Sequence, residues 1–219
     1  MRIYYLSPSQ FAISNLALRR LKIARISDLN DPFELLAMIV RNEEDLRVFS
    51  MLKDRLSKDN GLLCFSRSWE NPVLWGHYAD RHTGIALGFD VDDAQIQPVN
   101  YAKEPFAVTR DPITDLPSPT ENEMSTVLCT KFYDWKYEDE VRVFVQLDHA
   151  TKEGGLYFYP FDEKVVLREV VLGPKCELPL KAIRALVSEY TPTVEVIKSS
   201  IALGTFRVVK NELASRAGI

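Results

Sequence analysis

Cysteines are few in this sequence, and none stands in a motif that would bind a metal or build a disulfide framework. Cys64, Cys129 and Cys176 are widely separated and odd in number, and no C-x-x-C spacing occurs. These features exclude a disulfide-rich scaffold and a structural zinc site. We expect reduced, buried thiols, the usual state in the cytoplasm, and no bound metal.

Long apolar runs are also missing. No window approaches the ~18 apolar residues that a membrane span requires, and no apolar segment near the N-terminus ends in a small-residue cleavage site. The chain has 219 residues, of which 46% are hydrophobic and 26% charged, as in folded soluble proteins. Acidic residues outnumber basic ones by 31 to 27, which argues against a surface that binds nucleic acid throughout. We predict a cytoplasmic protein with a single domain over residues 1–219 and no membrane contact.

Familiar catalytic motifs are absent as well: the sequence has no Walker loop, G-x-G-x-x-G, H-E-x-x-H or G-x-S-x-G. What it has is a regular series of short elements. Their order predicts an α+β fold with mixed, mainly antiparallel sheets flanked by helices. The segment over 103–120 contains prolines and no sustained period, so we expect a long surface loop of the kind that often carries function. Helices are predicted over 8–20, 42–58, 71–80, 121–131 and 178–190, and strands over 2–6, 23–26, 62–66, 84–89, 98–101, 137–147, 156–159, 165–172, 194–198 and 205–209.

Strict alternation marks the predicted strand over 137–147. It directs Val141, Val143 and Val145 to the core and places Glu138, Glu140 and Arg142 on the opposite face. Replacing Val143 by Asp should therefore destabilise the fold, whereas Glu140→Gln should leave the melting temperature nearly unchanged.

The carboxylates on this strand suggest chemistry. Two carboxylates that are two residues apart repel, so one tends to have a raised pKa while Arg142 keeps the other ionised. Such an arrangement can orient a ribose hydroxyl or stabilise an oxocarbenium-like centre. The alternative is a solvated strand face with a surface Glu-Arg pair.

Two other segments are candidates for a binding surface. The loop from Asn30 to Glu34 is rich in side chains that bond their own backbone, and we expect it to be scaffolding with Phe33 buried. Trp75 and Tyr78 are three residues apart on a predicted helix, so they should share a face on which a planar ring could stack. Plain core packing by both rings is the alternative.

These segments together resemble a bacterial family known as domain of unknown function 2971. The resemblance covers most of the chain up to Gly173. The residues that carry it are Tyr4-Tyr5, Asn30-Asp31-Pro32-Phe33-Glu34, Leu63-Cys64-Phe65-Ser66, Asn71-Pro72, Trp75, His77-Tyr78-Ala79-Asp80, Gly84, Lys131, Trp135, Tyr137-Glu138, Glu140 and Arg142.

A more distant resemblance is to the ADP-ribosyltransferase fold, with Tyr5 in the place of the first-strand histidine, Tyr78 as the helix aromatic and Glu138 or Glu140 as the later carboxylate. It implies an NAD-consuming enzyme, a toxin or phage-defence effector that modifies a protein or nucleic acid. NAD is then a substrate, and further partners would be a second copy of the chain or a cognate antitoxin. The roles implied are catalysis by Glu140, with Glu138 near the acceptor, and NAD binding by Tyr5, Arg2, Tyr78, Trp75 and Ser66.

Two other functions fit the same residues. One is a non-catalytic protein-interaction module of a defence or toxin-antitoxin system, in which Trp135, Tyr137 and the loop from Asn30 to Glu34 contact a protein partner. The other is a phosphodiesterase or nuclease that binds magnesium through carboxylates, namely Asp31, Glu34, Glu138 and Glu140.

Overall fold

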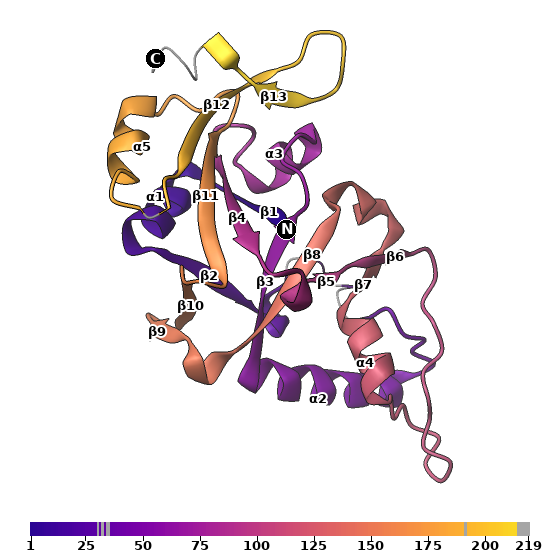
Figure 1. Ribbon diagram of the computed structural model, residues 1–219. Coiled ribbons are helices and arrows are strands. Elements are labelled where there is room, and N and C mark those ends of the chain that lie inside the picture. Colours follow the sequence, from indigo (N-terminus) through magenta and orange to yellow (C-terminus); the bar gives the residue numbers. More distant parts are fainter. Residues whose placement is uncertain (30, 32, 34–35, 191, 214–219) are drawn as a thin grey trace.

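The computed structural model describes residues 1–29, 31, 33, 36–190 and 192–213, and it confirms the α+β class (Figure 1). The α-helices are α1 (Ser9–Leu18), α2 (Glu43–Asp59), α3 (Pro72–Tyr78), α4 (Glu121–Leu128) and α5 (Leu180–Leu186). Short 3-10 helices are η1 (Ile26–Asp28), η2 (Asp93–Gln95), η3 (Tyr133–Glu138) and η4 (Leu147–His149). The strands are β1 (Arg2–Ser7), β2 (Arg20–Arg25), β3 (Asn60–Ser66), β4 (Ile85–Val91), β5 (Gln97–Pro98), β6 (Asn100–Ala102), β7 (Thr130–Phe132), β8 (Glu140–Gln146), β9 (Thr151–Glu153), β10 (Leu156–Pro160), β11 (Val165–Leu172), β12 (Glu195–Ile201) and β13 (Val208–Lys210).

Most of these strands form one mixed sheet in two parts. One part runs β13-β12-β11-β4-β1, and the other runs β5-β8-β3-β2-β10-β9. Among the described strand pairs, β11 with β12 and β6 with β7 are parallel, and the others are antiparallel. The prediction of a mainly antiparallel sheet is therefore confirmed.

The two parts meet at β3, where the sheet forks. β8 pairs with one edge of β3 along its whole length, from Asn60 to Ser66. On the other edge β2 pairs with Gly61 and Leu62, whereas β1 pairs with Ser66. Because β1 and β2 diverge along this edge, a gap opens between them beside residues 63–65.

The core lies largely on one face of β8, as the alternation predicts. Val141, Val143 and Val145 are buried in the main hydrophobic cluster with Leu63 and Phe65 of β3. On the opposite face a second cluster joins Phe49 of α2, Leu62 of β3 and Val127 of α4. Both faces of this part of the sheet are therefore covered.

The alternative interpretation of the polar face of β8, a solvated stripe with a surface Glu-Arg pair, is wrong. Glu140 is 5% exposed and Arg142 is 1% exposed, so this face is as dry as the valine face. The segment that carries α4 lies over it, and Arg142 Nη1 donates to the Leu128 carbonyl at 2.6 Å. Alternation correctly separated the two faces, but it could not show that a distant segment covers the polar one.

The predicted strand over 137–147 begins later than expected. Tyr133–Glu138 forms η3, and β8 starts at Glu140 after Asp139, whose φ is 44°. Aspartate adopts this left-handed conformation more readily than most residues, so it can end the 3-10 helix and turn the chain into the strand. Glu138 consequently projects from the end of η3 and not from a strand.

Phe33 is 70% exposed, so the prediction that it is buried is wrong. The predicted turn chemistry is present, because the Asp31 carboxylate accepts a hydrogen bond from the Phe33 backbone N–H at 2.9 Å. This turn directs the Phe33 ring outward. Asn30, Pro32 and Glu34 of the same loop lie outside the described residues.

The segment over 103–120 extends away from the sheet beside α4 (Figure 1). Arg110 of this segment donates to both oxygens of the Asp45 carboxylate in α2, at 2.8 and 3.1 Å. Thr109 donates its backbone N–H to Glu123 of α4 at 2.9 Å. The loop is thus anchored to two helices. In the part of the chain that the structure describes, no helix is both long enough and apolar enough to cross a bilayer.

Candidate functional site

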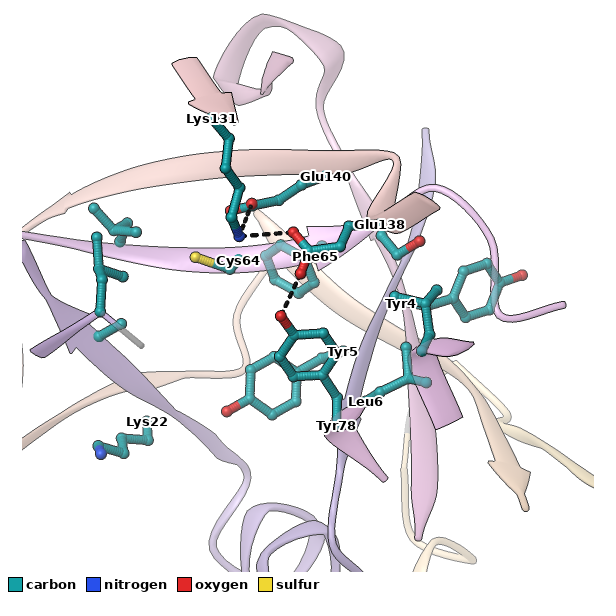
Figure 2. A pocket seen from close by; sticks show the side chains of 15 residues that line it. Tyr4, Tyr5, Leu6, Lys22, Cys64, Phe65, Tyr78, Lys131, Glu138 and Glu140 are labelled. Carbon is teal, nitrogen blue, oxygen red and sulfur yellow. Dashed lines mark hydrogen bonds and ion pairs between the residues drawn. The ribbon is translucent and has the colours of Figure 1, made fainter. Parts of the chain in front are cut away.

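A pocket of about 410 Å³ lies in the fork between β1 and β2. This volume falls within the range of small-molecule sites, roughly 300–1,000 Å³. Figure 2 shows Lys131, Glu138 and Glu140 together on one wall, called the polar wall below, with Lys22 apart from them. The lining residues come from β1, β2, β3, α3, β7, η3 and β8 and the segment after η1: Tyr4, Tyr5, Leu6, Lys22, Ala24, Leu29, Leu62, Cys64, Phe65, Ser66, Leu74, Tyr78, Lys131, Glu138 and Glu140.

Most of the residues predicted from the sequence meet in this pocket. Tyr5 of β1, Ser66 of β3, Tyr78 of α3 and both glutamates line it. The Ser66 hydroxyl donates to the Ser68 carbonyl at 2.8 Å, and the Tyr5 ring packs edge-on against Phe65. Burial raises the pKa of Tyr5 to about 12, so its hydroxyl stays protonated and can donate at neutral pH.

Arg2 and Trp75 lie elsewhere, although we expected both at the site. The Arg2 guanidinium donates to Asp90 of β4 at 2.6 Å and also pairs with Glu169 of β11. Both partners belong to strands on one side of β1, whereas β3 lies on the other side. Trp75 is fully buried in a separate cluster, and its Nε1 donates to the Trp69 carbonyl at 2.6 Å.

The orientation of α3 explains the placement of Trp75. The pocket face of this helix carries Leu74 and Tyr78, which are four residues apart, and not Trp75 with Tyr78. Asn71 caps the helix by accepting from the Val73 N–H at 2.9 Å, and its Nδ2 donates to the Tyr137 carbonyl at 3.1 Å. This second bond ties the start of α3 to η3 and brings Tyr78 toward Glu138.

Two carboxylates and two cations form a buried network on the polar wall (Figure 2 shows three of the four). Lys131 Nζ lies 2.7 Å from Glu138 Oε2 and 3.2 Å from Glu140 Oε2. Arg142 Nε donates to Glu140 Oε1 at 2.8 Å, and the Tyr78 hydroxyl donates to Glu138 Oε1. With both carboxyl groups ionised, the network is neutral.

The two carboxyl groups differ in acidity. Burial raises the pKa of Glu138, and the charge of Lys131 offsets only part of that effect. Burial acts on Glu140 too, but the charges of Arg142 and Lys131 outweigh it, so the pKa of Glu140 is lowered. The protein environment thus favours the ionised form of Glu140 and disfavours that of Glu138.

The two groups also differ in how many donors surround them. Glu140 accepts two hydrogen bonds from the Arg142 guanidinium, at 2.8 and 3.3 Å, and one from Lys131. Each Glu138 oxygen accepts one bond, from Tyr78 or Lys131. A carboxylate oxygen has two lone pairs, so Glu138 retains acceptor capacity for a ligand hydroxyl.

Sequence reasoning assigned no role at the site to Lys131, Cys64 or Lys22. The helix predicted through Lys131 ends at Leu128, and Lys131 instead stands on β7, which directs its ammonium into the network. The available signal was electrostatic, because two neighbouring carboxylates beside a single arginine need a second cation. Cys64 on β3 and the exposed Lys22 on β2 reach the pocket only because the sheet forks there.

The fold and the site define an α+β protein with a small-molecule-sized pocket and a buried carboxylate pair. The family model described as "Protein of unknown function (DUF2971)" matches residues 74–143, about a third of the chain. The match spans Tyr78, Lys131, Glu138 and Glu140, and it supports the family resemblance drawn from the sequence. Neither the comparison with curated proteins nor that with solved structures found a match.

Proposed function

We propose that the protein is an NAD-consuming ADP-ribosyltransferase-like enzyme and that the pocket in the fork is its active site. The observation that carries the proposal is convergence: Tyr5, Tyr78 and Glu138 are far apart in the sequence and line one pocket. Their chain order, a first-strand donor, a helix aromatic and a later carboxylate, is the order on which the resemblance to that fold rests.

The chemistry follows from the polar wall. Cleavage of the bond between nicotinamide and ribose leaves positive charge on the sugar carbon while the bonding electrons depart with nicotinamide. An ionised carboxylate in a dry site stabilises such a centre. Glu138 in its ionised form is placed for this role, because its oxygens retain acceptor capacity in the pocket. An acceptor nucleophile then bonds to the same carbon and releases its proton.

The contacts change the roles proposed for the two glutamates. We inferred from the sequence that Glu140 acts on the ribose and Glu138 on the acceptor. In the structure Glu140 is held by Arg142 and Lys131, so it serves better as the support of the network. We therefore propose Glu138 as the group that contacts the ribose. The aromatic ring of Tyr78 remains the proposed stacking surface. Lys22, which lines the pocket and is exposed, takes over the NAD-binding role expected of Arg2.

The test is to incubate purified protein with NAD and with protein or nucleic-acid acceptors, following nicotinamide release and acceptor mass. We expect Glu138→Gln to reduce nicotinamide release about 100-fold or more, comparable to losing one preorganised electrostatic partner. The exposed Glu163 provides the matched control, since Glu163→Gln removes the same charge away from the pocket. No binding of NAD by calorimetry, with no nicotinamide release, would refute the proposal.

A non-catalytic interaction module is the second candidate, and one observation favours it. His77, Trp135 and Tyr137 form an aromatic cluster next to the pocket, with ring centroids 5.6 to 6.3 Å apart. His77 is exposed and the other two rings are half-buried, and aromatic residues are enriched at protein interfaces. If this candidate is right, Trp135→Ala should abolish partner capture while Glu138→Gln leaves it intact.

A magnesium site at the two glutamates receives less support. Lys131 Nζ already lies between Glu138 and Glu140, at the point where a bridging cation would bind. Within the described residues no group of three or more His, Cys, Asp or Glu side chains is arranged to hold a metal ion. We therefore expect magnesium to leave the melting temperature unchanged, and a clear rise with added magnesium would favour the phosphodiesterase hypothesis.

A further inference from the structure

Lys131 is the cation of the network that serves Glu138. Its side chain is 5% exposed, and its ammonium bonds one oxygen of each glutamate, at 2.7 and 3.2 Å. The same ammonium lies 4.9 Å from the centroid of the Trp135 ring. A lysine side chain loses much conformational entropy when it is fixed, so contacts with three partners indicate a specific placement.

The glutamates need this cation because they come from separate elements. Glu138 ends η3 and Glu140 begins β8, with the left-handed Asp139 between them. Two buried carboxylates this close repel unless a cation lies between them. Arg142 donates to Glu140, whereas Lys131 contacts both carboxylates, so Lys131 joins Glu138 to the rest of the network.

Lys131 also lines a second pocket, of about 270 Å³, next to Phe132 and Lys103. Lys131 thus lines both pockets, and its ammonium bonds the two glutamates that line the fork. The ammonium bonds Glu138 Oε2 and the Tyr78 hydroxyl bonds Oε1, so each carboxylate oxygen has its own donor and the two bonds together restrain the orientation of the group.

We infer that Lys131 is a positioning residue that holds the Glu138 carboxylate in the orientation in which it faces a ligand in the pocket. The role in turnover rests on the proposed function, whereas the effect on Glu138 can be measured without NAD. Lys131 acts through Glu138 and does not itself contact the reacting atoms.

Lys131 sets the electrostatic surroundings of Glu138. The groups that face Glu138 are Tyr78 from α3, Lys131 from β7, Glu140 from β8, Tyr101 from β6 and Tyr137 from η3, while Arg142 acts on Glu140. Lys131 is the one cation among those that contact Glu138 directly in the described structure. Removing it leaves burial and the charge of Glu140 unopposed, and both favour the protonated form.

The experiment follows the titration of Glu138 by NMR in protein labelled with ¹³C at the glutamate carboxyl groups. The Glu138 signal is assigned by its loss in Glu138→Gln. We expect Lys131→Met to shift the Glu138 titration midpoint upward by about one pH unit or more, the usual effect of one nearby opposite charge. Lys131→Arg keeps the positive charge and should leave the Glu138 midpoint close to the wild-type value. The control Lys136→Met, at an exposed neighbouring lysine, should not change the midpoint.

A folded Lys131→Met protein with an unchanged Glu138 midpoint would overturn the inference and leave Lys131 as a space-filling residue. If Lys131→Met does not fold, the inference is tested on the wild-type protein through the NMR signal of the Lys131 ammonium. Its Lys131 ¹⁵Nζ signal should be protected from exchange and should shift together with Glu138, and rapid exchange like that of exposed lysines would overturn the inference. Where NAD is turned over, the acidic limb of kcat/KM should move upward with the midpoint. Absence of turnover in the wild type counts against the proposed function alone.

Discussion

Glu140→Gln is the substitution that best tests the buried network. It preserves side-chain shape and removes one negative charge, so Arg142 and Lys131 are left with a single carboxylate. Glu140 and Arg142 are 5% and 1% exposed, and their contacts include a 2.8 Å bond. Breaking a buried pair by removing one partner costs about 3–5 kcal/mol. Because Gln keeps one acceptor oxygen, we expect a loss at the lower end, about 3 kcal/mol.

The assay is urea denaturation at neutral pH, comparing the free energy of unfolding and the m-value of each variant with the wild type. The control is Glu195→Gln, because Glu195 is 53% exposed and its pair with Lys210 is on the surface. Such a pair contributes about 0–1 kcal/mol. A change for Glu140→Gln no larger than that of the control would refute the reasoning, and it would restore the solvated-stripe hypothesis drawn from the sequence.

Three further predictions concern the core, the surface and pH. Val143→Asp should lower the free energy of unfolding by more than about 3 kcal/mol in the same assay, because Val143 is 5% exposed and the new charge has no partner. Phe33→Ala should change it by less than about 0.5 kcal/mol, because the ring is 70% exposed, whereas Phe49→Ala at a buried position should cost about 3–5 kcal/mol. Burial raises the pKa of Tyr5 from 10.0 to about 12, so the stability that the neutral phenol contributes is complete below pH 10.0 and is lost as pH rises toward 12. Tyr5→Phe should therefore make stability fall less steeply over this window, and an identical pH profile for the two proteins would contradict the assignment.

Local patterns in the sequence determined the fold class and most of its elements. Alternation identified which face of β8 is hydrophobic, because successive side chains of a strand point to opposite faces whatever surrounds it. The cap at Asn71-Pro72 and the turn at Asp31 are set by neighbouring residues, and both occur in the structure. Local patterns selected Tyr78, Glu138 and Glu140 as candidates, the resemblance to the ADP-ribosyltransferase fold added Tyr5 and Ser66, and all five line one pocket.

Tertiary structure alone decided what covers each face. Whether Glu140 is solvated depends on α4 and β7, which no local pattern connects to β8. The fork exists because β1 and β2 pair with different ends of one edge of β3, and strand pairing over such distances is set by the packing of the whole sheet. The rotation of α3 about its axis put Leu74 beside Tyr78 and buried Trp75, a choice that the hydrophobic residues on all sides of this short helix leave open. The same long-range packing brings Lys131 to the site, since its ammonium meets the two glutamates where β7, η3 and β8 come together.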